Sequence, residues 1–268
     1  MYSMGKLLVQ NVSCGYDGRV VLKEVSFEIS SGEIIAFIGP NGSGKSTLFK
    51  TLDRLLKPLA GNVYLDGRDI WKLHEREVAK QIAFVCQSAH VSWPFTVRQA
   101  VTMGRFSHRG WVAAYTAEDS RVVDESLEAA GLSDIGERSI DTLSGGELQR
   151  VMIARALAQE PSVILLDEPV SNLDIKYQVT VLELVRSMAH NGMAVGVILH
   201  DLNLASLYAD RIGLLSNGEL AALGEPSQIL SKENIDAAYD TDVFVREHPL
   251  HPRPQVIYIP SWMKQEKE

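Results

Sequence analysis

Long hydrophobic runs are absent from this sequence of 268 residues, and positive charge is in deficit. The longest apolar stretches, such as residues 34–38 and 194–199, have strand length, whereas a bilayer-spanning helix needs about 20 apolar residues. The 26 Lys and Arg side chains are outnumbered by 34 Asp and Glu, which leaves a formal net charge of −8. We therefore expect neither an integral membrane protein nor a general nucleic-acid binder, whose affinity comes from a surplus of cations.

Cysteine is scarce as well, since the chain has only Cys14 and Cys86. Two scattered cysteines form neither a disulfide framework nor a zinc site, which favours a reducing compartment. The first ten residues lack the apolar stretch of a secretory signal, so we predict a cytosolic protein. With 46% hydrophobic and 22% charged residues, the composition is that of a folded globular chain with one large domain or two small ones.

Short apolar segments alternate with helical patterns along the chain, which is typical of an α/β fold. Strands are expected at residues 7–12, 33–38, 82–85, 163–166 and 194–199. Helices are expected to begin near Gly44, Ala117, Ser144, Asp174 and Asp201. Between residues 88 and 161 the strand signal disappears and apolar residues recur at helical spacing, which predicts an inserted helical subdomain. The Asn217-Gly218 pair predicts a β-hairpin, and the last residues of the tail are expected to fray.

A phosphate-binding pattern follows the second expected strand. It consists of Gly39, Pro40, Asn41, Gly42, Ser43, Gly44, Lys45, Ser46 and Thr47. The glycines let backbone N–H groups point at phosphate oxygens, Lys45 supplies positive charge to the β- and γ-phosphates, and Ser46 offers a hydroxyl ligand for Mg²⁺. The alternative is a glycine-rich turn with a surface lysine. Because a strand precedes the pattern and a helix follows it, nucleotide binding is the favoured interpretation.

Polar side chains follow two further expected strands: Asp167 and Glu168 come after residues 163–166, and His200 comes after residues 194–199. Charges at the end of a buried strand need a partner or a metal. In a phosphoryl-transfer site, Asp167 would hold Mg²⁺, Glu168 would orient and polarise the attacking water, and His200 would hydrogen-bond the γ-phosphate. Taken singly, an acidic pair is more often a capping turn and a histidine a core residue. The phosphate-binding pattern upstream reverses that preference.

A second phosphate-binding device opens the helix expected near Ser144. Ser144, Gly145, Gly146 and Glu147 combine a hydroxyl group with glycine amides at a helix N-terminus. On its own, a Ser-Gly-Gly segment would be an N-cap with flexible glycines. Its place between the first phosphate-binding pattern and Asp167 favours a functional role. The segment, with Leu143 before it and Leu-Gln-Arg after it, resembles the signature motif of ABC ATPases.

The resemblance to ABC ATPases covers most of the chain, with the motifs in family order. It implies an α/β fold with a P-loop NTPase (RecA-like) core, an antiparallel β-subdomain and an inserted helical subdomain. We accordingly expect a single nucleotide-binding domain over residues 1–268. Its expected parts are an ATPase core at 1–87 and 160–225, a helical subdomain at 88–159 and a C-terminal extension at 226–268.

The same resemblance implies further site residues and a dimer. Tyr16 would stack on adenine, Gln87 would sense the γ-phosphate and Mg²⁺, and Asp174 would end the loop that communicates between paired subunits. In this family two subunits pair head to tail, so Ser144 of one subunit would grip the ATP that Lys45 of the other subunit holds. ATP and Mg²⁺ are the implied ligands, and a homodimer is the implied assembly.

Residues 101–108 resemble the Val-x-x-Gly-Arg-x-Pro-His segment of importer ATPases for iron-siderophore, haem and cobalamin, with Ser107 in place of the usual proline. The tail at residues 243–260 is similar to theirs too. The alternative is that the apolar residues of the segment simply pack the helical subdomain while Arg105 and His108 are solvated. A proline interrupts the spacing between the two histidines of the tail, so we expect no metal site there.

An importer ATPase works with integral membrane permease subunits and, indirectly, with a periplasmic or extracellular substrate-binding protein. The resemblance therefore implies a peripheral location at the cytoplasmic face of the cell (inner) membrane. Importers of zinc, manganese or amino acids are the nearest alternative. A DNA-maintenance ABC ATPase would usually carry a long coiled-coil insertion, a translation ATPase would carry two motif sets, and a kinase or GTPase would lack the signature. We expect no nucleic-acid partner.

Overall fold

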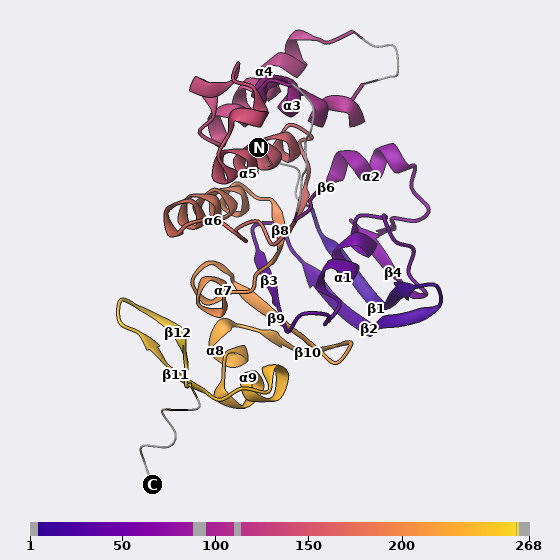
Figure 1. Ribbon diagram of the computed structural model, residues 1–268. Coiled ribbons are helices and arrows are strands. Elements are labelled where there is room, and N and C mark those ends of the chain that lie inside the picture. The colour runs from indigo at the N-terminus through magenta and orange to yellow at the C-terminus, as the bar shows by residue number, and fades with distance from the viewer. Residues whose placement is uncertain (1–4, 88–94, 110–113, 261, 263–268) are drawn as a thin grey trace.

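The computed structural model describes residues 5–87, 95–109, 114–260 and 262, and it is an α/β protein as predicted (Figure 1). The strands are β1 (Leu7–Tyr16), β2 (Arg19–Ile29), β3 (Ile34–Ile38), β4 (Ala60–Leu65), β5 (Arg68–Asp69), β6 (Ile82–Val85), β7 (Val163–Asp167), β8 (Ala194–Ile198), β9 (Arg211–Ser216), β10 (Glu219–Gly224), β11 (Val243–His248) and β12 (His251–Tyr258). The α-helices are α1 (Lys45–Leu52), α2 (Glu75–Gln81), α3 (Val97–Thr102), α4 (Ala117–Ala129), α5 (Gly145–Leu157), α6 (Ile175–His190), α7 (Leu202–Tyr208), α8 (Pro226–Ile229) and α9 (Lys232–Tyr239). Short 3-10 helices are η1 (Met103–Ser107), η2 (Ser133–Ile135) and η3 (Ile140–Thr142).

A six-stranded sheet with the order β10-β9-β3-β8-β7-β6 forms the centre of the molecule. Its strands pair in parallel except for the β9–β10 hairpin, whose turn holds Asn217 and Gly218 at the positive φ angles that a tight hairpin requires. All five residues of β3, β7 and β8 are buried. This burial on both faces explains why continuous apolar runs predicted these strands correctly.

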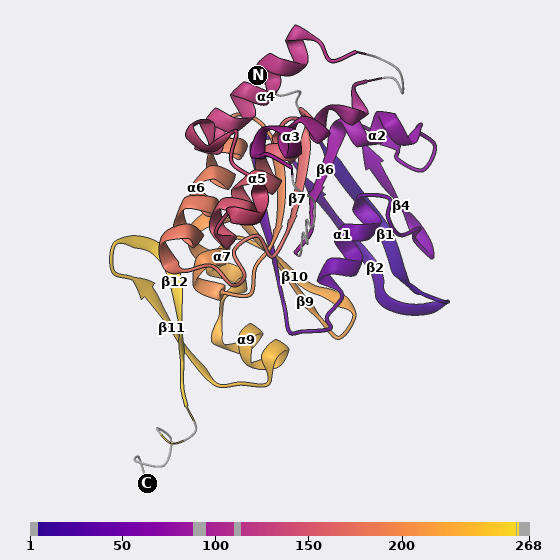
Figure 2. The same cartoon turned by 45° about the horizontal axis from the view of Figure 1, so that its top comes forward.

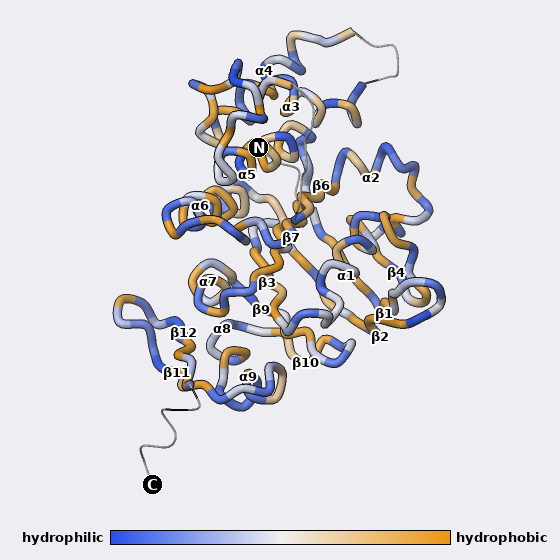
Figure 3. The backbone as a smooth tube through the Cα atoms, in the orientation of Figure 1, coloured by the Kyte–Doolittle hydropathy of each residue, from blue (hydrophilic) through white to orange (hydrophobic). Residues whose placement is uncertain are grey.

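Successive residues of the central strands enter two separate hydrophobic clusters. In β3, for example, Ala36 belongs to the cluster shared with α5 and α6, whereas Phe37 belongs to the cluster shared with α1 and the antiparallel strands. Figure 2 shows these two layers on opposite sides of the sheet. In Figure 3 the hydrophobic residues concentrate along β3, β7 and β9, between the more polar outer surfaces of the helices. The sheet is thus packed on both sides.

An antiparallel sheet with the order β2-β1-β4-β5 packs over α1. The sequence predicted β1 only as far as residue 12 and missed β2. Charged residues interrupt the first half of β2, whereas Val25, Phe27 and Ile29 alternate with polar residues in its second half. The two strands pair from Leu7 opposite Ile29 to Tyr16 opposite Arg19. The resulting β1–β2 hairpin brings Val21 next to the segment that follows β3.

Helix starts agree with the predicted positions because capping side chains mark them. Thr116, Ser144, Asp174 and Asp201 each accept a hydrogen bond from a backbone N–H group of the first helical turn. The region between β6 and β7 is helical in its described residues, as predicted, and runs through α3, η1, α4 and α5. Its assignment as a separate subdomain with boundaries at 88 and 159 stays a prediction, and residues 88–94 and 110–113 lie outside the described part.

The C-terminal region forms a two-stranded sheet, β11–β12, that the sequence did not predict. Asn203 of α7 holds β12 in place, since its side-chain amide both donates to and accepts from the backbone of Val256. The expected fraying concerns residues 263–268, which are not described. Among the described residues, no helix has both the length and the apolar character needed to cross a bilayer.

Candidate nucleotide-binding site

The loop between β3 and α1 contains the predicted phosphate-binding pattern. Its glycines Gly39, Gly42 and Gly44 have φ angles of 147°, 82° and 97°, a region that residues with a side chain rarely adopt. Lys45 folds back over the loop and donates from Nζ to the carbonyl oxygens of Gly39 at 2.8 Å and Pro40 at 3.0 Å. The lysine is buried. The loop therefore curls around the ammonium group of Lys45, at the N-terminus of α1.

Burial also changes the proton affinity of this lysine. It lowers the pKa of Lys45, while the neighbouring carboxylates of Glu168 and Asp167 oppose that shift by favouring the charged form. The ammonium group keeps carbonyl oxygens as its hydrogen-bond partners, and the backbone N–H groups at the N-terminus of α1 add partial positive charge beside it. The electrostatics of the loop therefore favour an anionic ligand.

Asp167, the last residue of β7, lies beside the first turn of α1. Ser46 donates from Oγ to Asp167 Oδ1 at 3.2 Å. Burial raises the pKa of Asp167, against the hydrogen bond from Ser46, which lowers it. The pair brings together hydroxyl and carboxylate oxygens, the ligand types that Mg²⁺ prefers, beside the phosphate-binding loop. Strand β7 thus brings residue 167 to a hydroxyl group 121 positions earlier.

The carboxylate of Glu168 is held from both sides. Its Oε1 atom lies 2.5 Å from His200 Nε2, and Gln87 donates a side-chain hydrogen bond to its Oε2 atom. Glu168 has a φ angle of 52°, an uncommon left-handed conformation that turns the chain at the end of β7. The structure therefore brings three of the predicted residues together. The predicted contact of His200 with a γ-phosphate stays a prediction, because here its partner is Glu168.

A cavity of about 300 Å³ opens in front of the phosphate-binding loop. The residues that line it are Val21, Asn41, Gly42, Gly44, Lys45, Ser46, Thr47 and Glu168. Val21 is the lining residue that sequence reasoning missed, because its place here depends on the unpredicted strand β2. Tyr16 is exposed at the end of β1 and does not line this cavity, so its predicted stacking on adenine stays a prediction.

The conformation of Gly39 gives a test of the loop. A Cβ atom at this position would lie 2.0 Å from the carbonyl oxygen of Leu215, and the φ angle of 147° already disfavours a side chain. We expect Gly39→Ala to displace the loop, to abolish nucleotide binding and to cost more stability than Gly67→Ala. Gly67 is a suitable control because its φ angle is also positive, at 77°, but nothing lies within 4 Å of an added Cβ. Urea unfolding and a nucleotide-binding titration measure both effects, and equal behaviour of the two variants would contradict the expectation.

The signature segment lies at the N-terminus of α5. Ser144 and Glu147 form a capping box, in which Ser144 N–H donates to the Glu147 carboxylate at 2.8 Å and Ser144 Oγ accepts from Glu147 N–H at 3.3 Å. Ser144 and Gly145 are exposed, whereas Gly146 is buried against Tyr177, whose Cγ atom would be 2.6 Å from an added Cβ. The sequence therefore found the cap, but the packing role of Gly146 was missed because Tyr177 belongs to α6.

The two predicted phosphate-binding segments do not meet within the chain. None of the signature residues lines the 300 Å³ cavity, and Figure 1 shows α5 well apart from α1. Asp174 caps α6 by accepting from Tyr177 N–H at 3.1 Å, and it is exposed as well. Ser144, Gly145 and Asp174 are therefore exposed at the surface, outside this cavity.

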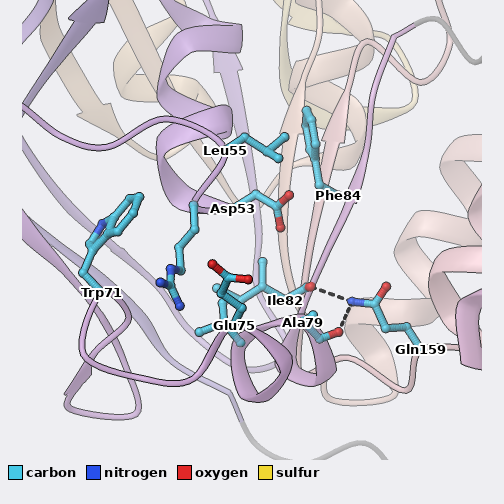
Figure 4. A pocket seen from close by; sticks show the side chains of 10 residues that line it. Asp53, Leu55, Trp71, Glu75, Ala79, Ile82, Phe84 and Gln159 are labelled. Carbon is cyan, nitrogen blue, oxygen red and sulfur yellow. Dashed lines mark hydrogen bonds between the residues drawn. The ribbon is translucent and has the colours of Figure 1, made fainter. Parts of the chain in front are cut away.

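A second cavity, of about 490 Å³, lies between α1, α2 and β6 and is built differently. Asp53 enters it from the end of α1, and burial raises the pKa of this carboxyl group to about 7. Arg54 is not its partner, because the guanidinium group lies 5.0 Å above the Trp71 ring and donates to the carbonyl oxygen of Leu73. Figure 4 shows the Asp53 carboxyl group between the side chains of Leu55, Phe84 and Ile82. Among the described residues, no hydrogen bond or ion pair to this carboxyl group is found.

The alternative interpretation of residues 101–108, in which Arg105 and His108 are solvated, is wrong for Arg105. Arg105 is only 4% exposed and pairs with Asp119 and Glu160, while His108 is half-buried and contacts the carbonyl oxygen of Gln159. These partners are distant in sequence, so residue type alone suggested the opposite. Of the apolar residues that this alternative packs into the helical region, Val97 and Val101 are fully buried and Met103 is half-buried.

The arrangement of these groups agrees with a comparison against protein families. A family model described as ABC transporter matches residues 22–171, more than half of the chain. The chain belongs to the ABC transporter family. As a member of this family it is an ATP-binding protein and an ATPase, as predicted, and its sheet and helices have the architecture of a P-loop NTPase core.

Two relatives and one solved structure extend the family match over the whole chain. The ferric enterobactin transport ATP-binding protein FepC of Escherichia coli is 37% identical, over 95% of this chain and 94% of its own length. The hemin import ATP-binding protein HmuV of Rhizobium meliloti is 39% identical, over 92% and 96%. A structure assigned as a metal-chelate type ABC transporter in an inward-facing conformation superposes with a TM-score of 0.85 at 28% identity, covering 97% of this chain and 99% of that one.

Proposed function

We propose that this ABC ATPase is the ATP-hydrolysing subunit of an importer for a metal chelate, either an iron chelate such as a ferric siderophore or haem, or cobalamin. The observation that carries the proposal is the placement of Glu168, between His200 and Gln87, at the wall of the cavity that also contains Lys45. A carboxylate at this point can accept a proton from a water that attacks a γ-phosphate. The similarity to FepC and HmuV over almost the entire chain supports the substrate class.

The predicted site residues would bind ATP in the following way. The backbone amides of the loop Gly39–Thr47 and the ammonium group of Lys45 would hold the β- and γ-phosphates, and Tyr16 would stack on the adenine ring. Ser46, Asp167 and Gln87 would hold Mg²⁺, which suits their oxygen donors. When bound, Mg²⁺ neutralises charge on the β- and γ-phosphate oxygens. The Glu168 carboxylate would orient water, and His200 would keep that carboxylate in place.

A head-to-tail homodimer would complete this site. Ser144, Gly145, Gly146 and Glu147 would contact the γ-phosphate held by the partner, with Asp174 at the subunit boundary. The exposure of Ser144 and of Ile175, which is 80% exposed directly after Asp174, supports an interface at this surface. ATP would then join two subunits through charge-assisted hydrogen bonds, and removal of the γ-phosphate would weaken the dimer.

Transport requires partners that cross the membrane. We propose integral permease subunits as direct partners, a periplasmic or extracellular substrate-binding protein as an indirect one, and a peripheral position at the cytoplasmic face of the inner membrane. The importer names of two relatives that match nearly the full chain support this assembly. The net charge of −8 supports the absence of a nucleic-acid partner.

Uptake by the complete complex tests the substrate class. The ATPase is purified with its permease subunits, reconstituted in vesicles with the substrate-binding protein, and supplied with ATP and labelled ferric siderophore, haem or cobalamin. We expect uptake of at least one of these chelates, and no uptake by a complex that carries Glu168→Gln. Uptake of zinc, manganese or an amino acid in place of every chelate would assign the importer to the alternative class.

A further inference from the structure

The short helix η1 covers the C-terminal end of α5 through three successive contacts. Gly104 lies so close to α5 that an added Cβ atom would be 2.1 Å from the carbonyl oxygen of Arg155. Arg105 donates to the carbonyl oxygen of Ala158 at 2.8 Å, and His108 Nε2 lies 2.8 Å from the carbonyl oxygen of Gln159. Carbonyl groups at a helix C-terminus lack partners within the helix. Here Arg105 and His108 contact the carbonyl oxygens of Ala158 and Gln159, the two residues that directly follow α5.

Arg105 is the centre of these contacts. It is almost completely buried, and its guanidinium group also pairs with Asp119 of α4 at 2.9 Å and with Glu160 at 2.6 Å. A buried guanidinium group is tolerated only where good geometry and hydrogen bonds compensate the loss of water. Arg105 therefore joins η1, α4 and the end of α5 in one arrangement. A cation at a helix C-terminus also interacts favourably with the helix dipole.

The opposite end of α5 carries Ser144. Helix α5 spans 13 residues, and a helix of this length is a rod of about 20 Å. Helix α5 packs against α3, α4 and α6 along its length, and Gly104, Arg105 and His108 add the contacts that hold its C-terminal end. A displacement at that end changes the position and direction of the exposed serine at the other end.

We infer that Gly104, Arg105 and His108 form a clamp that positions the signature helix for the nucleotide of the partner subunit. The inference rests on the proposed head-to-tail dimer. It gives the Gly-Arg-x-x-His segment a task in the ATPase cycle. These are positioning residues, because they contact α5 and not the nucleotide. A clamp of this kind affects the dimer and leaves phosphate binding at Lys45 within one subunit unchanged.

Two binding constants of each variant separate this role from a merely structural one. In a Glu168→Gln background, which retains ATP, analytical ultracentrifugation gives the dimerisation constant at saturating ATP. A fluorescent ATP analogue at low protein concentration gives the nucleotide affinity of the single subunit. The variants are Gly104→Ala, His108→Ala and Arg105→Lys, and Arg121→Ala is the control. Arg121 is an exposed arginine of α4 with two ion pairs, to Glu118 and Glu125. Both partners belong to α4 itself, so neither ion pair reaches α5.

We expect Gly104→Ala and His108→Ala to weaken dimerisation by about 10- to 100-fold, because small misplacements of positioned groups have effects of this size. The single-subunit nucleotide affinity of these two variants is expected to stay within about twofold of that of the parent. For Arg121→Ala, both the dimerisation constant and the nucleotide affinity are expected to stay within about twofold. The dimerisation constant of Arg105→Lys should lie between those of the parent and of Gly104→Ala. An ammonium group keeps the charge but cannot reach all partners of the planar guanidinium group.

Two results would overturn the inference and leave the proposed dimer standing. One is unchanged dimerisation of folded Gly104→Ala and His108→Ala. The other is a loss of single-subunit nucleotide affinity as large as the loss of dimerisation. Because neither substitution leaves a buried charge unpaired, these variants decide the matter even if Arg105→Lys does not fold. A parent that binds ATP without dimerising would instead overturn the proposed dimer, and the inference with it.

Discussion

Replacing Glu168 by glutamine is expected to lower ATP turnover by about 10²- to 10⁴-fold, the usual contribution of a positioned general base. The amide has the shape of the carboxylate and can remain between Gln87 and His200, but it cannot accept a proton from water. ATP affinity should persist, because the ligands of the phosphate groups are unchanged. Dimers should therefore accumulate with ATP. Steady-state phosphate release and size-exclusion chromatography with ATP measure the two effects.

Glu77→Gln is the matched control for this substitution. Its carboxylate pairs with Arg68 at the surface, 2.5 Å away, and it does not line the nucleotide cavity. Its turnover should equal that of the parent. If Glu168→Gln also hydrolyses ATP within about twofold of the parent, the role of Glu168 as the base is rejected.

Replacing Asp53 by asparagine is expected to make the protein more stable above pH 7 and to change its stability little near pH 4. Burial raises the pKa of Asp53 from 3.8 to about 7, so between these values the folded state binds more protons than the unfolded state. Stability of the parent therefore falls as the pH rises through this range. The full cost above pH 7 is on the order of 4 kcal/mol, and asparagine avoids it because it carries no charge.

Urea unfolding of parent and variant at pH 4.5 and pH 8 measures this effect as a difference, which cancels groups that titrate alike in both proteins. Asp17→Asn serves as the control, since it neutralises an exposed carboxyl group in the β1–β2 turn. A stability difference between parent and Asp53→Asn that is the same at both pH values would exclude the unpaired carboxyl group as its source.

Features with a local physical cause were predicted well from the sequence. Strands β3, β7 and β8 are buried on both faces, so the sequence has a continuous apolar run at residues 34–38, 163–166 and 194–198. The starts of α4, α5, α6 and α7 were predicted to within one residue because capping side chains precede them. The phosphate-binding loop was also predicted well, because its glycines and Lys45 lie in one contiguous segment and contact each other there.

Features that depend on distant partners could not be predicted from residue patterns. The arrangement of Gln87, Glu168 and His200 joins residues 81 and 32 positions apart. The strand ends predicted Glu168 and His200 in one site, whereas only the resemblance to a family added Gln87. The burial of Arg105 depends on Asp119 and Glu160, 14 and 55 positions away. Strand β2 is a different case, because the alternation of buried Val25, Phe27 and Ile29 with polar residues is a strand signal in the sequence itself.

The alternation of β3 between two hydrophobic clusters links the stability of both layers to ATP binding. Ala36 and Phe37 are neighbours in sequence, yet one depends on the helices over the sheet and the other on the antiparallel strands beneath it. The loop that begins at Gly39 directly follows this strand, so melting of either layer removes its foundation. We therefore expect a destabilising core substitution on either side of the sheet to weaken ATP binding as well as stability.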